Sequence, residues 1–166
     1  MSLDNIQLPP TVIQQLFNNS LIDLNGEKKV ADINAAASLS FLGNNEKKII
    51  LIVSEDDALY LREDSLNFLL SILTPCKLTL ADVALINVKK TTVVSYHLLA
   101  NELKAEKIIL FGTPVSVLDL PLQFADYKLQ QFNNQTYLSA QSLELIKNDK
   151  EAKLKLWACL KTMFNI

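Results

Sequence analysis

Glycine is scarce in this sequence, and its scarcity excludes several nucleotide-binding motifs. The 166 residues contain only three glycines, Gly26, Gly43 and Gly112. A P-loop and a dinucleotide-binding fingerprint each need glycines within a few residues of one another, so neither is present. The glycine-flanked serine of a nucleophile elbow is also absent. The sequence therefore argues against an ordinary enzyme with a nucleotide cofactor, and we expect no cofactor.

Histidine and cysteine are almost as rare. His97 is the only histidine, which excludes a multi-histidine metal site and argues against a Ser-His-Asp triad. On a helical wheel His97 lies opposite Tyr96 and Leu99, so we expect it to be a solvated surface side chain. Cys76 and Cys159 are too far apart in sequence for a zinc or iron–sulfur motif. Their apolar helical surroundings predict small core residues in a reduced compartment.

Concentrated positive charge is missing as well. The formal net charge is −2, and the basic residues are scattered along the chain, which argues against strong autonomous binding to nucleic acid. No apolar run approaches about 20 residues, the length that spans a bilayer. The N-terminus lacks the basic start and apolar block of a signal peptide. We therefore expect a cytoplasmic protein that does not associate with membranes.

The sequence does contain alternating strand and helix patterns. Apolar runs rich in β-branched residues predict buried strands at 47–53, 82–88 and 106–112. Apolar residues at helical spacing predict helices at 63–76, where Pro75 stops the pattern, and at 91–105. This order predicts an α/β fold, a three-layer α/β/α sandwich with a short, mainly parallel central sheet.

The rest of the chain completes this domain. A short helical turn is predicted at 113–120, strand material at 126–138, and helices at 139–148 and 149–164. Ser139 is expected to cap the first of these two helices. An apolar stripe on the second consists of Ala152, Leu156, Leu160 and Met163.

An N-terminal segment precedes the predicted core. The stretch "LPPTVIQQLFNN" predicts a short helix with Val12, Ile13, Leu16 and Phe17 on one face. We assign residues 1–46 to this helix and an irregular lead-in packed on or near the core. Residues 47–166 are assigned to the α/β core, so the chain is expected to form one domain overall.

Acidic residues follow the first predicted strand at once. Ser54 ends the apolar run, and Glu55, Asp56 and Asp57 occupy the loop position where open α/β proteins place their chemistry. These acids are candidates for a paired-carboxylate or magnesium site. Three consecutive acids cannot all point into one pocket, however. We therefore favour a solvated strand end and expect no metal.

The second predicted strand ends in polar residues. Asn87, Lys89 and Lys90 lie on the same rim as the acidic loop, where they are weak candidates for contact with a nucleic-acid phosphate. Adjacent lysines are commonly only solvated, so a purely solvated pair is the alternative interpretation. Trp157 lies beside the apolar stripe of the last helix, and we expect it to pack in the core.

Three stretches of the chain occur together in a recognisable order and spacing between about Lys47 and Phe164. They are "EDSLNFLLSILTPCKLTLADVALINVKK", "LLANELKAEKIILFGTPVSVLDL" and "TYLSAQSLELIKNDKEAKLKLWACLKTMF". In this order they resemble segments of the uracil-DNA glycosylase superfamily, particularly its iron–sulfur branch. The resemblance implies a uracil-DNA glycosylase-like fold.

The residues that this family uses for catalysis are replaced here. Where the family has Gly-Glu-Ala-Pro-Gly, this chain has "VSEDD", with Glu55 as the nearest equivalent of the family's glutamate. Where the family has its catalytic His-Pro-Ser, this chain has Leu138, Ser139 and Ala140. The four cysteines of the iron–sulfur cluster are absent too. The resemblance therefore implies a vestigial site at 54–57 and 138–139 that lacks glycosylase activity.

One group with this fold also lacks the glycosylase active site. It comprises the psi subunits of bacterial DNA polymerase III, whose last helix is similar to "AKLKLWACL". In that group the N-terminal segment docks on the clamp loader and the folded domain binds the chi subunit. The resemblance implies a non-catalytic protein-interaction subunit of the bacterial DNA replication machinery, which binds replisome partners through Val12, Ile13, Leu16 and Phe17. The same helix packing on its own domain is the alternative.

Two other functions stay open from the sequence. A degenerate glycosylase-like protein or enzyme that retains the cleft after the first strand would bind nucleic acid. An unrelated hydrolase that uses the acids at 55–57 would need at least one of these carboxylates to be buried with a raised pKa.

Overall fold

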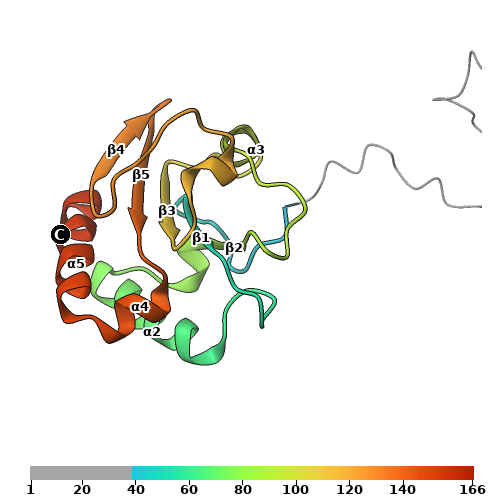
Figure 1. Ribbon diagram of the computed structural model, residues 1–166. Helices are drawn as coiled ribbons and strands as arrows, with labels where there is room; N and C mark the ends of the chain where they lie inside the picture. The colour runs from blue at the N-terminus through green and yellow to red at the C-terminus, as the bar shows by residue number, and fades with distance from the viewer. Residues whose placement is uncertain (1–38) are drawn as a thin grey trace, which may run out of the picture. The chain divides into compact units, whose positions relative to one another are not determined.

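The computed structural model describes residues 39–166, which fold around a five-stranded sheet (Figure 1). The strands are β1 (Ile49–Val53), β2 (Val83–Asn87), β3 (Lys107–Phe111), β4 (Leu129–Phe132) and β5 (Gln135–Ala140). They lie in the order β2-β1-β3-β5-β4, and within this sheet only β4 runs antiparallel to its neighbour. The prediction of an α/β protein with a mainly parallel sheet is confirmed.

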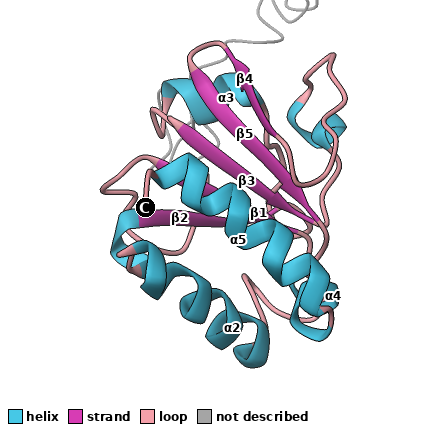
Figure 2. Ribbon diagram, turned by 90° about the vertical axis from the view of Figure 1, so that its left-hand side faces the viewer, coloured by secondary structure: helices cyan, strands magenta, loops and turns pink. Residues whose placement is uncertain are grey.

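Helices cover both faces of this sheet (Figures 1 and 2). The helical elements are α2 (Glu63–Leu73), η1 (Thr74–Cys76), η2 (Leu80–Asp82), α3 (Tyr96–Asn101), η3 (Val115–Leu118), α4 (Leu143–Asn148) and α5 (Lys150–Phe164). On one face α2, α4 and α5 pack against side chains such as Leu51 and Ile109. On the other face α3 and η3 pack against Ile52 and Ile108. Successive residues of the central strands thus enter two cores, which explains their unbroken apolar runs.

Helix α3 is shorter than the sequence predicts. The helix expected at 91–105 begins only at Tyr96 and ends at Asn101. Ser95 caps it, because its Oγ accepts a hydrogen bond from the Leu98 N–H at 3.3 Å. The four residues before Ser95 are all β-branched, which lowers their helix propensity. His97 is exposed on this helix, as predicted.

The extended region predicted at 126–138 forms a β-hairpin. Its strands β4 and β5 pair antiparallel and turn at Asn133 and Asn134, whose φ angles are 49° and 61°. Positive φ at both central residues is the geometry of the commonest two-residue hairpin turn, and asparagine tolerates it better than most residues.

The start of α4 differs from the prediction. Ser139 lies inside β5, where it pairs with Leu110, so the expectation that it caps the next helix is wrong. Ser142 caps α4 instead, with its Oγ accepting from the Leu145 N–H at 3.4 Å. Strand β5 continues through Ser139, so the cap lies three residues later than expected.

Helix α5 has the predicted apolar stripe. Its buried residues are Ala152, Leu156, Leu160 and Met163. Cys159 is half-buried beside them and Cys76 is buried under α2, and burial raises the pKa of both thiols. Within residues 39–166, α5 included, no helix combines the length and the apolar character needed to cross a bilayer.

Part of the predicted lead-in lies against β2. Leu42 and Leu85 exchange backbone hydrogen bonds of 2.9 and 2.8 Å. Gly43 has a φ of 109°, and a Cβ at this position would lie 2.2 Å from the carbonyl oxygen of Val83. Only glycine can therefore let the chain approach β2 so closely. Residues 1–38, with the candidate partner-binding residues Val12, Ile13, Leu16 and Phe17, lie outside the described residues.

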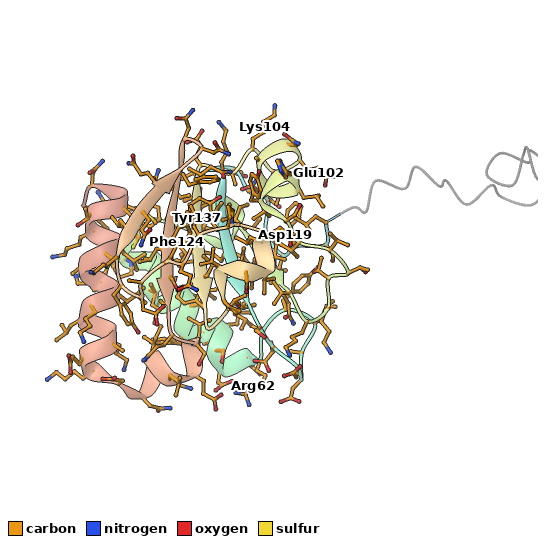
Figure 3. All side chains as sticks on the ribbon, turned by 45° about the horizontal axis from the view of Figure 1, so that its top comes forward. Arg62, Glu102, Lys104, Asp119, Phe124 and Tyr137 are labelled. Carbon is orange, nitrogen blue, oxygen red and sulfur yellow. The ribbon has the colours of Figure 1, made fainter. Side chains whose placement is uncertain are left out.

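A buried polar network ties β5 to the loop before β3. Tyr137 is fully buried, and its hydroxyl donates to Gln135 Oε1 at 2.7 Å. The Gln135 amide nitrogen in turn donates to the carbonyl oxygen of Ala105 at 2.9 Å. The ring of Phe124 packs beside Tyr137, with 5.1 Å between centroids (Figure 3). Burial raises the pKa of Tyr137 from 10.0 to about 12.

We expect this network to make stability depend on alkaline pH. Unfolded tyrosine loses its proton near pH 10 while folded Tyr137 keeps its proton to about pH 12, so the free energy of unfolding should fall across that window. Tyr137→Phe should cost about 1–2 kcal/mol at pH 7, because Gln135 Oε1 loses its donor, and should flatten the alkaline decline. Urea unfolding between pH 7 and pH 12 measures both effects.

The matched control is Tyr60→Phe, which removes a hydroxyl from an exposed hydrogen bond with Ser40. It should change the free energy of unfolding by less than about 0.5 kcal/mol. An alkaline decline of equal steepness in wild type and Tyr137→Phe would contradict the assignment to Tyr137.

Candidate functional site

Four parallel strands end at one edge of the sheet, which we call the carboxyl edge. Two hollows open there on either side of the end of β3. The smaller, about 260 Å³, is the β1–β3 hollow, and the larger, about 670 Å³, is the β3–β5 hollow. In open α/β sheets, ligands bind where the strand order reverses, which here is between β1 and β3. The β1–β3 hollow is therefore the candidate site.

The predicted acidic loop forms one wall of the β1–β3 hollow. Ser54 and its three acidic neighbours lie on this wall, and Ser142, Leu143 and Glu144 at the start of α4 lie opposite. Arg62 and Ser65, at the start of α2, complete the lining together with the strand ends. A cleft thus lies after the first strand.

The side-chain amide of Asn87 holds the acidic loop in place through hydrogen bonds to its backbone. Its Oδ1 accepts from the backbone N–H groups of Glu55 at 3.0 Å and Lys89 at 3.1 Å. Its Nδ2 donates to the carbonyl oxygens of Glu55, Ala58 and Leu59 at 2.8, 3.1 and 3.2 Å. Asn87 is 1% exposed. Its amide is fully used inside the protein and has no capacity left for a phosphate.

Among the three predicted acids, only Glu55 turns inward. Its side chain is 15% exposed, against 77% for Asp56, and Asp57 is also exposed. Its carboxylate lies 3.6 Å from Arg62 Nε, and Arg62 also reaches Glu144 at 3.5 Å. The charges of Glu55, Glu144 and Asp64 raise the pKa of Arg62. Glu55 therefore faces the fixed positive charge of Arg62.

Both lysines of the predicted phosphate-binding rim turn toward the acidic loop. Lys89 Nζ lies 3.6 Å from the carboxylate of Asp56. Lys90 Nζ donates to the carbonyl oxygen of the same residue at 2.8 Å. The structure thus brings Asn87, Lys89 and Lys90 together with the acids, as predicted. It gives all three of them partners within the protein.

The second half of the predicted vestigial site is divided between the core and the larger hollow. Leu138 is fully buried among the apolar residues of the α2–α4–α5 face. Ser139 lines the β3–β5 hollow and donates from its Oγ to Asp126 Oδ1 at 2.6 Å. Neither residue lines the β1–β3 hollow. The structure therefore does not place the 54–57 and 138–139 segments around one pocket.

Gly112 and Ser142 separate the two hollows. Gly112 has a φ of 61°, and a Cβ there would lie 2.8 Å from the Cβ of Ser142. Ser142 lines both hollows, since it lies between them at the start of α4. The close contact between Gly112 and Ser142 therefore explains why position 112 is a glycine.

Within residues 39–166, neither a histidine nor a metal-binding cluster lies beside the acids. His97 lines neither hollow. Within residues 39–166 no group of three or more His, Cys, Asp or Glu side chains is arranged to hold a metal ion. Of the three acids, only Glu55 is largely buried, so it is the one that the hydrolase hypothesis would have to use.

Sequence reasoning missed the central position of Arg62. This residue begins α2 and is the only arginine in the chain, which was a signal available in the sequence. Figure 3 shows Arg62 at the opposite end of the domain from Glu102 and Lys104, which lie near the end of α3. The sequence could not reveal that Arg62 would face both Glu55 and Glu144, because these residues are brought together only by the fold.

Comparisons with known proteins add no family assignment. No protein-family model matches this chain. No curated protein matches it either.

We expect replacement of Asn87 to release the acidic loop. Asn87→Leu should lower the free energy of unfolding by about 3 kcal/mol, because it leaves buried backbone N–H and C=O groups without partners. Amide hydrogen exchange should show lost protection of the Glu55 N–H at the same time. Urea unfolding and exchange measurements check the two effects.

Asn101→Leu is the matched control, because Asn101 is exposed at the end of α3. It should shift stability by less than about 0.5 kcal/mol. If Asn87→Leu were as mild as this control, the amide would not be what holds the loop.

Proposed function

We propose that this chain is a non-catalytic protein-interaction subunit, comparable to the psi subunits of the bacterial replication machinery. The observation that carries the proposal is that polar side chains of the carboxyl edge pair with other groups of the same edge. Glu55 faces Arg62, Asp56 faces two lysines, and Asn87 is used by backbone groups. An edge occupied in this way has no free acid–base pair to offer a substrate.

The resemblance to psi subunits supports the same proposal from the sequence. It combines a glycosylase-like order of segments with the loss of the family's two signature loops. The mainly parallel sheet, covered on both faces, is compatible with that fold. In this proposal Val12, Ile13, Leu16 and Phe17 form the apolar face of a docking helix for a clamp-loader or other replisome subunit.

Affinity purification of the full chain from its native cells tests this proposal. Clamp-loader subunits should co-purify with the wild-type chain, and the double variant Leu16→Asp/Phe17→Asp should lose them, because aspartate cannot enter an apolar groove. Mass spectrometry of the eluates gives the composition. Leu59→Asp is the control, since Leu59 is 63% exposed and its replacement should leave the partners bound.

A purification that repeatedly returns no replisome subunit would count against the psi-like function. Equal loss of partners in the Leu59→Asp control would show that the effect is not specific to the N-terminal helix.

A second candidate function is weak nucleic-acid binding by a degenerate glycosylase-like cleft. The β1–β3 hollow favours it, because this cleft of about 260 Å³ lies directly after the first strand, beside the acidic loop that Lys89 and Lys90 contact. The side chains of Ser54, Arg62 and Ser65 line this hollow together with the acids of the loop.

This second candidate predicts binding of single-stranded or uracil-containing DNA that weakens as salt rises. Lys89→Ala/Lys90→Ala should then reduce affinity about tenfold in fluorescence anisotropy at low salt. The primary proposal expects no salt-dependent binding and no difference between this variant and wild type.

A further inference from the structure

An apolar groove lies between α2 and α5, away from both hollows of the carboxyl edge. We call it the α2–α5 groove, and its volume is about 170 Å³. One wall is formed by Phe68, Ile72 and Pro75, and the other by Leu156, Trp157 and Leu160. Lys153 is the only charged residue among those that line it. Figure 2 shows the two helices on the same face of the sheet.

Lysines lie over the aromatic rings of this groove. Lys153 Nζ is 5.7 Å from the ring centroid of Phe68, and Lys161 Nζ is 5.5 Å from that of Trp157. The neighbouring ion pairs join Lys147 to Asp64 and Lys155 to Glu151. Within residues 39–166, no ion pair includes either of the two lysines above the rings. The rim of the groove is therefore positive and has no carboxylate of the described domain to neutralise it.

One edge of α5 continues this surface into solvent. Lys150, Leu154, Trp157 and Lys161 follow one another at intervals of three or four residues, which places them along a single edge of the helix. Leu154 is 61% exposed, so it adds apolar area beside Trp157. No acidic residue occurs at these positions. The edge therefore has two apolar side chains in the middle and a lysine at each end.

We propose that the α2–α5 groove binds an acidic amphipathic helix of a protein partner. The apolar side chains of that helix would fill the groove, and its Asp or Glu side chains would meet Lys153 and Lys161 at the rim. The residues that line the groove are other than those of the candidate N-terminal docking helix. The inference therefore rests on the proposed function only in that the chain acts through protein partners.

Single-stranded nucleic acid fits this surface less well. Base stacking needs free aromatic faces, but lysines already lie over the rings of Phe68 and Trp157. The groove walls are also mainly aliphatic and offer few polar groups to a base. A protein helix uses the same lysines and leaves them over the rings.

Trp157 is the only tryptophan in the chain, so its fluorescence reports directly on the groove. We would titrate the full chain with a synthetic helical peptide of about 18 residues, with leucines along one face and glutamates on its flanks. The control peptide has lysines in place of the glutamates. The glutamate peptide should shift the emission to shorter wavelength and bind about tenfold more tightly than the lysine peptide. Equal binding of the two peptides would overturn the proposal.

Charge reversal on the rim provides the matched variants. Lys153→Glu/Lys161→Glu should weaken binding of the glutamate peptide about tenfold, whereas Lys155→Glu, on the opposite edge of α5, should change it less than about twofold. Equal weakening by the two variants would contradict a role for the rim. A thymidine oligonucleotide that bound more tightly than the glutamate peptide would assign the groove to nucleic acid instead.

The N-terminal variant separates this inference from the proposed function. Leu16→Asp/Phe17→Asp should leave peptide binding to the groove unchanged even where it abolishes clamp-loader capture. Loss of peptide binding in that variant would contradict the assignment of the binding site to the α2–α5 groove.

Discussion

The rest of the carboxyl edge depends on the side-chain amide of Asn87. This one group joins the end of β2 to the loop after β1, through hydrogen bonds to the backbone of Glu55, Ala58, Leu59 and Lys89. A buried amide with all its hydrogen bonds made is rigid, because any movement leaves donors and acceptors unpaired. The position of the acidic loop is therefore set by the protein interior and not by a ligand.

The charges around the loop follow from that fixed backbone. With the loop in place, Glu55 turns toward Arg62 at the start of α2, and Asp56 turns toward Lys89. Arg62 in turn connects the loop to Glu144 at the start of α4. Each of these contacts is partly exposed and contributes modestly to stability. Together they pair Glu55 and Asp56 with cations of the same edge.

Two apolar features of the chain carry the proposed protein interactions. The α2–α5 groove combines aromatic side chains with unneutralised lysines, and the sequence pattern of residues 8–19 predicts a helix with an apolar face. Both features are typical of docking surfaces for helices. These features agree with the proposal that the chain acts through protein partners.

The sequence predicted the sheet more completely than the site. Buried parallel strands leave unbroken apolar runs, so β1, β2 and β3 could be located within two residues at each end. The stripe on α5 was equally clear. The boundaries of α3 and α4 were harder to predict. β-branched residues before α3 occur in helices and in extended chain, and more than one serine can cap α4.

The site was harder to predict because its contacts join distant segments. Asn87 was identified as a rim residue, but its role depends on a loop 32 residues earlier in the chain. The proximity of Arg62 to Glu144, and the separation of Leu138 from the acids, likewise arise only when strands and helices pack. Composition and spacing carry no signal for such pairings.

The central claim is that the acids after β1 are structural and that the chain works by binding. The most direct measurement compares the wild-type chain with the triple variant Glu55→Gln/Asp56→Asn/Asp57→Asn in affinity purification from native cells. The account predicts a folded variant that captures the same partners in the same proportions as wild type. A variant that keeps its fold but loses those partners would contradict it, because the acids would then be part of the functional site.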